Sequence, residues 1–158
     1  MAKVWWCNQT DCWDDEYAAG YVCAAEPRGP GGLKYRRMVS QIRRGDIVLH
    51  YLAGTCAGVV AVSRAESSSQ YGIVPVRGPR CWTHRAHGWY VRARYHAFGK
   101  PILRHRFIKT LAALRIPEGP TSASGRIRYA YLTRASPRVL AIIKAAHASP
   151  DAWPHWAR

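Results

Sequence analysis

Alternation between apolar and polar positions is the strongest pattern along this chain, and it predicts several short β-strands. Residues 2–8 (AKVWWCN) are rich in aromatic and β-branched side chains, a composition typical of strands. Residues 43–54 and 55–65 are two apolar runs joined by a short glycine-containing connection, which predicts a β-hairpin. Residues 89–98 (WYVRARYHAF) and 126–133 (RIRYAYLT) alternate, so each places successive side chains on opposite faces of a sheet.

The clearest helix is predicted over residues 135–148 (ASPRVLAIIKAAHA). Ser136 is a natural N-cap, and Pro137 takes the first helical position, where its missing N–H costs nothing. Apolar side chains recur at helical spacing and form a stripe at Val139, Leu140, Ile142, Ile143 and Ala146. We therefore expect this helix to pack by one face against the rest of the protein.

Three other segments carry weaker signals. Residues 11–21 (DCWDDEYAAGY) predict a short helix with Asp11 as the N-cap and acids in the first turn. Residues 33–42 (LKYRRMVSQI) favour a helix with its apolar side chains turned inward. Residues 100–114 begin with a proline break and continue as a strand end or a short helix.

Glycine and proline break up the remaining stretches. Residues 26–32 and 117–125 are predicted loops, and residues 66–88 form a long polar loop, which inside a compact domain is more often functional than idle. Short strands and a few helices that do not strictly alternate predict an α+β fold. We expect one domain over residues 1–158, a twisted β-barrel of about five to six strands flanked by two to three helices, with residues 147–158 as a C-terminal tail.

Charge narrows the choice of partner. Lys and Arg number 24 against nine acids, a net charge of +15. Residues 1–26 hold one Lys and five acids, net −4, so residues 27–158 hold 23 basic residues and four acids, net +19. Such a surface binds polyanions, and arginines interleaved with aromatic residues favour nucleic acid over lipid headgroups.

Other classes find little support. The chain has no apolar run near the roughly 20 residues of a membrane span, and its first residues do not form a signal peptide. We therefore expect a soluble, intracellular protein without a membrane partner. Five irregularly spaced cysteines predict reduced thiols. Neither Cys7 with Cys12 nor Cys81 with His84 and His87 has convincing metal-ligand spacing, so no metal or other cofactor is expected.

Five stretches, in order, resemble EVE domains, which belong to the PUA-like superfamily and are related to YTH domains. These domains have a Trp-rich first strand running into Asn-Gln, a GD-x-V-x-x-Y strand, a GV/VAV strand, a GW-x-V strand ending in PI, and a closing strand and helix. The matching stretches span about residues 4–146: VWWCNQT (4–10), Gly20-Tyr21, IRRGDIVLHYLAGTCAGVVAVSRA (42–65), GWYVRARYHAFGKPI (88–102) and GRIRYAYLTRASPRVLAII (125–143).

The resemblance implies a PUA-like barrel that reads a modified base. EVE modules, alone or fused to nucleases, are linked to modified DNA, notably 5-methyl- and 5-hydroxymethylcytosine, and the WWxNQ subset is similar to the restriction-associated group. YTH relatives hold N6-methyladenosine of RNA in an aromatic cage. The resemblance thus implies a prokaryotic-type, cytoplasmic and nucleoid-associated protein that favours modified DNA, flipped or single-stranded, with a possible nuclease fusion or partner.

Several residues are candidates for the base pocket. Asn8 and Gln9 each carry a donor and an acceptor on a short arm, which suits hydrogen bonds to a base edge. Trp82, in the long loop, is the first candidate for a stacking wall. Further candidate wall positions are Trp6, Tyr21, Cys23 and Tyr51. Many EVE relatives carry an aromatic residue near the position of Cys23, so that wall is either thinner here or supplied by Tyr21.

Positions along the chain also predict the location of the other tryptophans and the arginines that contact phosphates. Trp13 and Trp89 are expected in the core, and Trp153 and Trp156 in tail packing or an interdomain contact. Asp46 of the RRGD turn is expected to stabilise the hairpin. The arginines expected to contact phosphates are Arg28, Arg36, Arg37, Arg77, Arg80 and Arg85.

Three alternatives remain open. A reader of modified RNA or of N6-methyladenine would use the same aromatic pocket. A nucleic-acid enzyme would use Cys81 with His84 or His87, although no orienting acid lies nearby in sequence. A purely structural basic adaptor would account for the charge alone. No nuclease or NTPase motif is present, so we expect no catalytic activity, and any cutting would come from a fused region or a partner.

Overall fold

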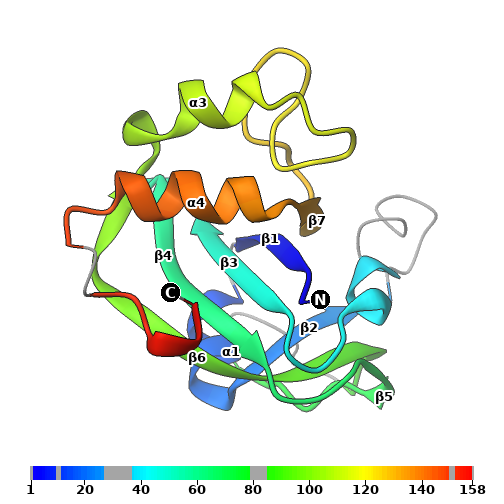
Figure 1. Cartoon of the computed structure of the whole chain (residues 1–158). Helices are drawn as coiled ribbons and strands as arrows, with labels where there is room; N and C mark the ends of the chain where they lie inside the picture. Colours follow the sequence, from blue (N-terminus) through cyan, green and yellow to red (C-terminus); the bar gives the residue numbers. More distant parts are fainter. Residues whose placement is uncertain (1, 10–11, 27–36, 79–84, 150–151, 158) are drawn as a thin grey trace.

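One curled seven-stranded sheet forms the frame of the protein in the computed structural model, which describes residues 2–9, 12–26, 37–78, 85–149 and 152–157 (Figure 1). Neighbouring strands follow the order β2-β6-β4-β3-β1-β7, and β5 pairs with β6. β1 runs parallel to β3, and the other described pairs are antiparallel. The strands are β1 (Val4–Gln9), β2 (Tyr21–Ala25), β3 (Ile47–Leu52), β4 (Gly58–Ala65), β5 (Gln70–Ile73), β6 (His87–Leu103) and β7 (Leu132–Ala135).

Short helices connect and cover the strands. The α-helices of the described residues are α1 (Trp13–Ala19), α3 (Ile108–Ala113) and α4 (Pro137–Ala146). Three 3₁₀ turns accompany them: η1 (Met38–Gln41), η2 (Arg104–Arg106) and η4 (His155–Ala157). None of these described helices has the length and apolar character needed to cross a membrane.

β6 curls the sheet because it is long enough to pair with different strands along its length. Its first part pairs with β2 on one side and β5 on the other, and its second part pairs with β4. Register shifts between His50 and Tyr51 in β3 and between Val59 and Ala61 in β4 add local twist. The result is a half-barrel, which confirms the predicted α+β class with a twisted, barrel-like sheet.

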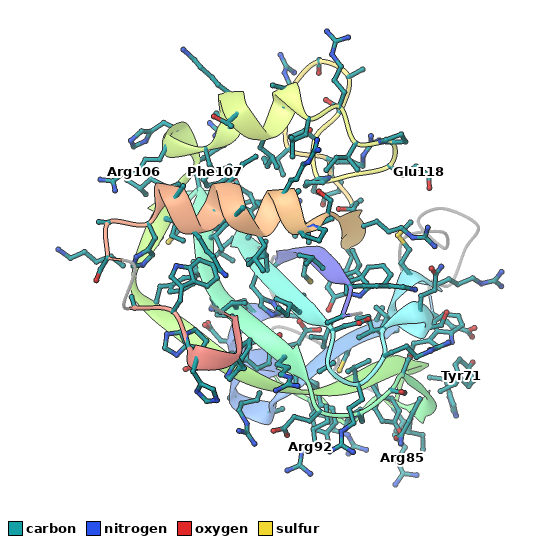
Figure 2. The ribbon with its side chains drawn as sticks, in the orientation of Figure 1. Tyr71, Arg85, Arg92, Arg106, Phe107 and Glu118 are labelled. Atoms are coloured by element: carbon teal, nitrogen blue, oxygen red, sulfur yellow. The ribbon has the colours of Figure 1, made fainter. Side chains whose placement is uncertain are left out.

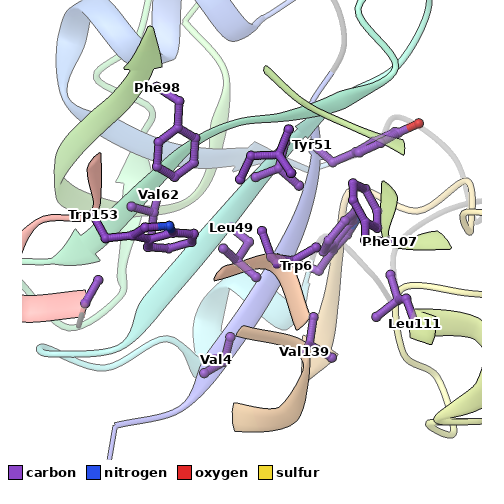
Figure 3. Packing of buried hydrophobic residues seen from close by; sticks show 14 residues of the cluster. Val4, Trp6, Leu49, Tyr51, Val62, Phe98, Phe107, Leu111, Val139 and Trp153 are labelled. Atoms are coloured by element: carbon purple, nitrogen blue, oxygen red, sulfur yellow. The ribbon is translucent and has the colours of Figure 1, made fainter. Parts of the chain in front are cut away.

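The apolar core lies on both faces of the sheet. Residues of α3, α4 and the C-terminal segment cover one face, where they pack on Trp6 and Leu49 (Figures 1 and 3). The other face carries a second cluster that includes Trp5, Val48 and residues of η1. Every residue of β1 is buried, because the strand lies between these two clusters.

Asp46 joins the start of β1 to the turn before β3. Its buried carboxylate accepts hydrogen bonds from the backbone N–H of Lys3 at 2.9 Å, from Nε1–H of Trp5 at 2.9 Å and from the backbone N–H of Arg43 at 3.0 Å. Three donors compensate for taking the charge out of water. The carboxylate thus ties β1 to the turn before β3, and across the predicted hairpin the backbone carbonyl of Asp46 accepts a hydrogen bond from the N–H of Ala65 at 2.8 Å.

Most predicted elements are present, with some corrections. β5 lies inside residues 66–88, which were predicted as loop, and β7 covers only the last part of the segment 126–133. Of the helix predicted over 33–42, residues 33–36 lie outside the described residues, Arg37 is helical, and the 3₁₀ turn η1 follows it. α4 begins as predicted with Ser136 at the N-cap and Pro137 at the first position, although the Ser136 side chain makes no capping hydrogen bond. Cys12 takes the N-cap position of α1, and Asp11 lies outside the described residues.

The C-terminal tail is part of the core. The ring of Trp153 is buried, with its centroid 5.0 Å from that of Phe98. Ala157 is buried in the same cluster, and Trp156 packs against it. These contacts agree with the expected tail packing of Trp153 and Trp156.

Candidate functional site

Trp6 and Tyr51 do not line an open pocket. Their rings stack on each other at a centroid distance of 5.4 Å and an interplanar angle of 27°, and the ring of Phe107 meets Trp6 at 6.0 Å (Figure 3). Both side chains are buried beneath α3 and α4. Their prediction as pocket walls is therefore wrong, because helices formed much later in the chain cover this face of β1.

Asn8 binds the protein's own backbone. Its Nδ2 donates a hydrogen bond to the carbonyl oxygen of Arg128 at 3.2 Å, and its backbone N–H donates to the carbonyl of Tyr131 at 2.8 Å. The side chain is buried. Asn8 thus ties the segment before β7 to the end of β1, and its prediction as a reader of a base edge is corrected to this structural role.

Tyr21 and Cys23 lie on the outer face of β2, beneath the segment that follows β5. Cys23 is buried against Val74 and Val76, so it is not a wall of an open pocket. Tyr21 is half-buried, with its ring centroid 6.2 Å from that of Tyr90. Of these two candidates, Tyr21 alone keeps part of its surface accessible.

The structure describes three of the six arginines that were predicted to contact phosphates. Arg37, Arg77 and Arg85 are exposed, as a phosphate contact requires. The remaining candidates lie outside the described residues: Arg28, Arg36, Arg80 and the proposed stacking residue Trp82.

A buried polar network lies at the end of β1, formed by Gln9, Glu16, His50, Ser63 and Tyr131. Oε1 of Glu16 accepts hydrogen bonds from the hydroxyl of Tyr131 at 2.8 Å and from the backbone N–H of Cys23 at 3.1 Å. Nε2 of Gln9 lies 3.2 Å from Nδ1 of His50, whose Nε2 lies 2.7 Å from Oγ of Ser63. We call these five residues the β1–α1 network.

Burial keeps the carboxyl of Glu16 mainly protonated. Burial raises the pKa of Glu16 to about 8, against the lowering effect of hydrogen bonds from Tyr131 and Gln9, so the carboxyl is mainly protonated at pH 7. Oε2 of Glu16 and Oε1 of Gln9 have no hydrogen-bond partner in this buried site, which adds to the cost of ionising the carboxyl. Beyond Glu16, Gln9 donates to Nδ1 of His50, and Nε2 of His50 donates to Ser63.

His50 has the protonation state that this direction requires. Burial lowers the pKa of His50 to about 3, so the ring is neutral at pH 7. A neutral ring offers one acceptor and one donor nitrogen. Nδ1 therefore accepts from Gln9 while Nε2–H donates to Ser63.

Aromatic rings separate the β1–α1 network from solvent. The ring centroid of Trp13 lies 5.6 Å from His50 and 5.3 Å from Tyr17, and that of Tyr95 lies 4.7 Å from His50. Tyr17 is 42% exposed and Trp13 is half-buried, so these two α1 rings reach the surface. Trp13 is therefore only partly in the core that the sequence predicted for it.

Glu16 is the site residue that the sequence analysis missed. Trp13, Glu16, Tyr17 and Gly20 follow a helical i, i+3, i+4, i+7 pattern, so the carboxyl lies on the same face of α1 as the two rings. Gly20 then ends the helix in the left-handed region at φ 74°, which returns the chain into β2. The signal in the sequence was an acid placed among aromatic residues at helical spacing. Because Asp14 and Asp15 precede it, Glu16 looks in the sequence like part of an ordinary run of acids in the first helical turn.

Basic side chains are spread over the described surface. Every Lys and Arg that the structure describes is exposed, except Arg128 and Lys144, which are half-buried. Exposed basic groups occur on β6, on the segments around β5, on η2 and α3, and at the start of α4. Figure 2 shows such side chains at Arg85, Arg92 and Arg106.

Several acids oppose this charge only weakly. Glu16 is buried and mainly neutral, and Asp46 is buried among its donors. Glu66 accepts a hydrogen bond from Nε of Arg94 at 2.8 Å and lies 3.4 Å from Nε of Arg92. These three of the chain's nine acids are thus withdrawn from solvent or paired.

The cysteines differ from the expected set of reduced thiols. Cys12 is disulfide-bonded, which corrects the expectation at that position. Cys7, Cys23 and Cys56 are free thiols. Burial raises the pKa of Cys7 and Cys23, so neither is an activated nucleophile.

The described residues contain no group of His, Cys, Asp and Glu side chains that could hold a metal ion. In the suggested Cys–His pairing, His87 is exposed at the start of β6. Cys81 and His84 lie outside the part of the chain that the structure describes.

Comparisons with known proteins establish the fold alone. No family model matches the chain, and no curated protein does. A hypothetical protein from Leishmania major has a TM-score of 0.60 at 12% identity, covering 92% of this chain and 96% of that one. A Pseudomonas putida protein (TM-score 0.59, 12% identity, 90% and 98% covered) and an Agrobacterium tumefaciens protein (0.58, 14%, 94% and 97%) are similar. All three share the fold over nearly its whole length.

Proposed function

We propose that this protein is a nucleic-acid-binding module of the EVE type that recognises a modified base. The observation that carries the proposal is the charge distribution: nearly all described basic side chains are exposed, while Glu16, Asp46 and Glu66 are buried or paired. Such a surface attracts phosphates along its length. The resemblance of the sequence to EVE domains is the reason for proposing a modified base, with 5-methyl- or 5-hydroxymethylcytosine in DNA as the first candidate.

Recognition of a base that has left the duplex requires stacking on aromatic side chains as well as positive charge. Taking a base out of a duplex costs a few kcal/mol, and stacking on aromatic rings returns roughly 1–3 kcal/mol per base. A buried methyl group adds only about 0.8 kcal/mol, so discrimination also needs hydrogen bonds and shape. Contacts from arginines to phosphates supply the remaining affinity.

The rings of α1 are the best-supported position for the base among the described residues. Trp13 and Tyr17 are partly exposed and lie over the β1–α1 network. Gln9, the one predicted edge reader that faces this side, contributes an amide whose direction is set by Glu16 and His50. We propose that a base stacks on Trp13 and Tyr17, with Gln9 and Glu16 beneath it.

Binding of matched oligonucleotides tests the proposal. We expect DNA carrying 5-methyl- or 5-hydroxymethylcytosine to bind several-fold more tightly than unmodified DNA of the same sequence, measured by fluorescence anisotropy. A preference for ribo-oligomers or for N6-methyladenine would instead indicate a different modified-base reader. Equal affinity for every oligomer would contradict base recognition and leave a basic adaptor.

A substitution at α1 tests the position of the site. We expect Tyr17→Ala to weaken binding to the modified oligonucleotide about 5- to 150-fold, the range of one lost stacking contact. Tyr129→Ala is the matched control, because Tyr129 is 91% exposed on another part of the chain. Equal affinities of the Tyr17 variant and the parent, with unchanged thermal stability, would place the base elsewhere.

A further inference from the structure

An exposed ring pair lies at the edge of the sheet formed by β5 and β6. Tyr71 of β5 is opposite Trp89 of β6, and their ring centroids are 5.2 Å apart at an interplanar angle of 58°. Ile73 is opposite His87 two pairs further along, which places it on the same face. Tyr71 is 53% exposed and Ile73 is 42% exposed. We call Tyr71, Ile73 and Trp89 the β5 patch.

The tyrosine ring is held in place from two sides. Trp89 is half-buried against the second core cluster and supports the ring of Tyr71. A hydrogen bond with the Glu26 carboxylate raises the pKa of Tyr71 and fixes the phenol end. A ring that is already positioned loses little conformational entropy when another flat group stacks on it.

The charges around the β5 patch favour a polyanion. Arg85 is exposed two residues before β6, and Figure 2 shows Arg85, Arg92 and Tyr71 at the same lower edge of the molecule. Of the two nearby acids, Glu66 pairs with Arg92 and Arg94, and Glu26 accepts a hydrogen bond from the phenol of Tyr71. Positive charge beside a fixed exposed ring is the combination that single-stranded nucleic acid binds.

We propose that the β5 patch stacks one unpaired base of the bound nucleic acid, with Arg85 on an adjacent phosphate. This inference rests on the proposed function, since it takes nucleic acid as the partner. It adds a second contact near the start of β6, separate from the rings of Trp13 and Tyr17. Because any base has a flat face, the contact is indifferent to base modification.

Two substitutions separate the roles of the ring and the charge. Tyr71→Ala is expected to weaken binding of a single-stranded DNA oligomer about 5- to 150-fold, with an unchanged salt dependence because no phosphate contact is lost. Tyr71→Phe keeps the ring and should bind as the parent does. Arg85→Gln is expected to reduce the slope of log K against log salt by about 0.7, the contribution of one single-strand phosphate.

Controls make each outcome decisive. Tyr129→Ala should leave affinity unchanged, and thermal melts of all variants should match the parent. In the unsubstituted protein, an oligomer containing 5-bromodeoxyuridine should photo-crosslink to the peptide that contains Tyr71, whatever the variants do. Affinity unchanged in Tyr71→Ala together with no crosslink there would overturn the inference and leave the patch free for a protein partner.

The same experiment distinguishes this inference from the proposed function. Loss of affinity in Tyr71→Ala by the same factor for modified and unmodified oligomers supports the β5 patch, even if no modification preference is found. If Tyr71→Ala binds as tightly as the parent and still prefers modified oligomers, the proposed function is supported and the β5 patch is rejected. Absence of binding to any oligomer rejects both.

Discussion

Glu16 of α1 is a buried carboxyl that is mainly protonated at pH 7. Its Oε1 accepts from Tyr131 and Cys23, whereas its Oε2 and the Oε1 of Gln9 have no hydrogen-bond partner. Burial raises its pKa to about 8, while Gln9 donates to the neutral ring of His50, whose Nε2 donates to Ser63. Buried networks of this kind are costly when half satisfied and stabilising when complete.

The pH dependence of stability follows from two of these groups. The pKa of Glu16 rises from 4.5 to about 8 on folding, so the folded state holds a proton that the unfolded chain releases, and stability falls with rising pH between 4.5 and 8. The pKa of His50 falls from 6.5 to about 3, so stability falls with decreasing pH between 6.5 and 3. We therefore expect a plateau near pH 4.5–6.5, where the two slopes cancel.

Glu16→Gln tests the origin of the alkaline slope. Between pH 6.5 and 8 the parent should lose up to about 2 kcal/mol, at roughly 1.4 kcal/mol per pH unit for one proton. The amide introduced by this substitution imitates the protonated carboxyl, so the variant's free energy of unfolding should stay nearly level over this range in urea titrations. Asp14→Asn, in the same helix but exposed, should keep the parent slope. A variant that loses stability with pH as the parent does would contradict a neutral Glu16.

At the scale of elements, local pattern predicted most of the strands and α4. Aromatic and β-branched runs identify β1, β3, β4 and β6, and Ser136-Pro137 marks the start of α4. Strand β5 was not predicted, because its four residues, QYGI, are too few to show alternation within a serine-rich segment. The pocket walls were assigned wrongly because alternation places Trp5 and Trp6 on opposite faces of β1 but does not show which face distant helices will cover.

Trp6→Ala separates a core role from a pocket role. Trp6 packs against Tyr51 and Phe107 beneath α3 and α4, so we expect a loss of about 3–5 kcal/mol in the free energy of unfolding. Affinity for nucleic acid, measured at a temperature where the variant is folded, should change little. Weakened binding with full stability would return Trp6 to the pocket.

At the scale of the whole molecule, folding buries some acidic side chains and leaves nearly all described basic side chains exposed. Helix α1 carries Glu16 of the acidic N-terminal segment into the interior, where its carboxyl is mainly protonated, and Asp46 is buried in the turn before β3. The basic side chains that the structure describes stay almost entirely outside. Net charge was available from the sequence, but the removal of acids from the surface depended on long-range contacts that no local pattern predicts.

The salt dependence of binding to a short single-stranded DNA tests this account most directly. If exposed arginines neutralise phosphates, log K should fall linearly with log salt, losing about 0.7 per contacted phosphate, and several contacts should give a slope steeper than about −2. The measurement is an anisotropy titration of the intact protein at a series of salt concentrations. An affinity that stays constant across the series, or no measurable binding at low salt, would contradict the account.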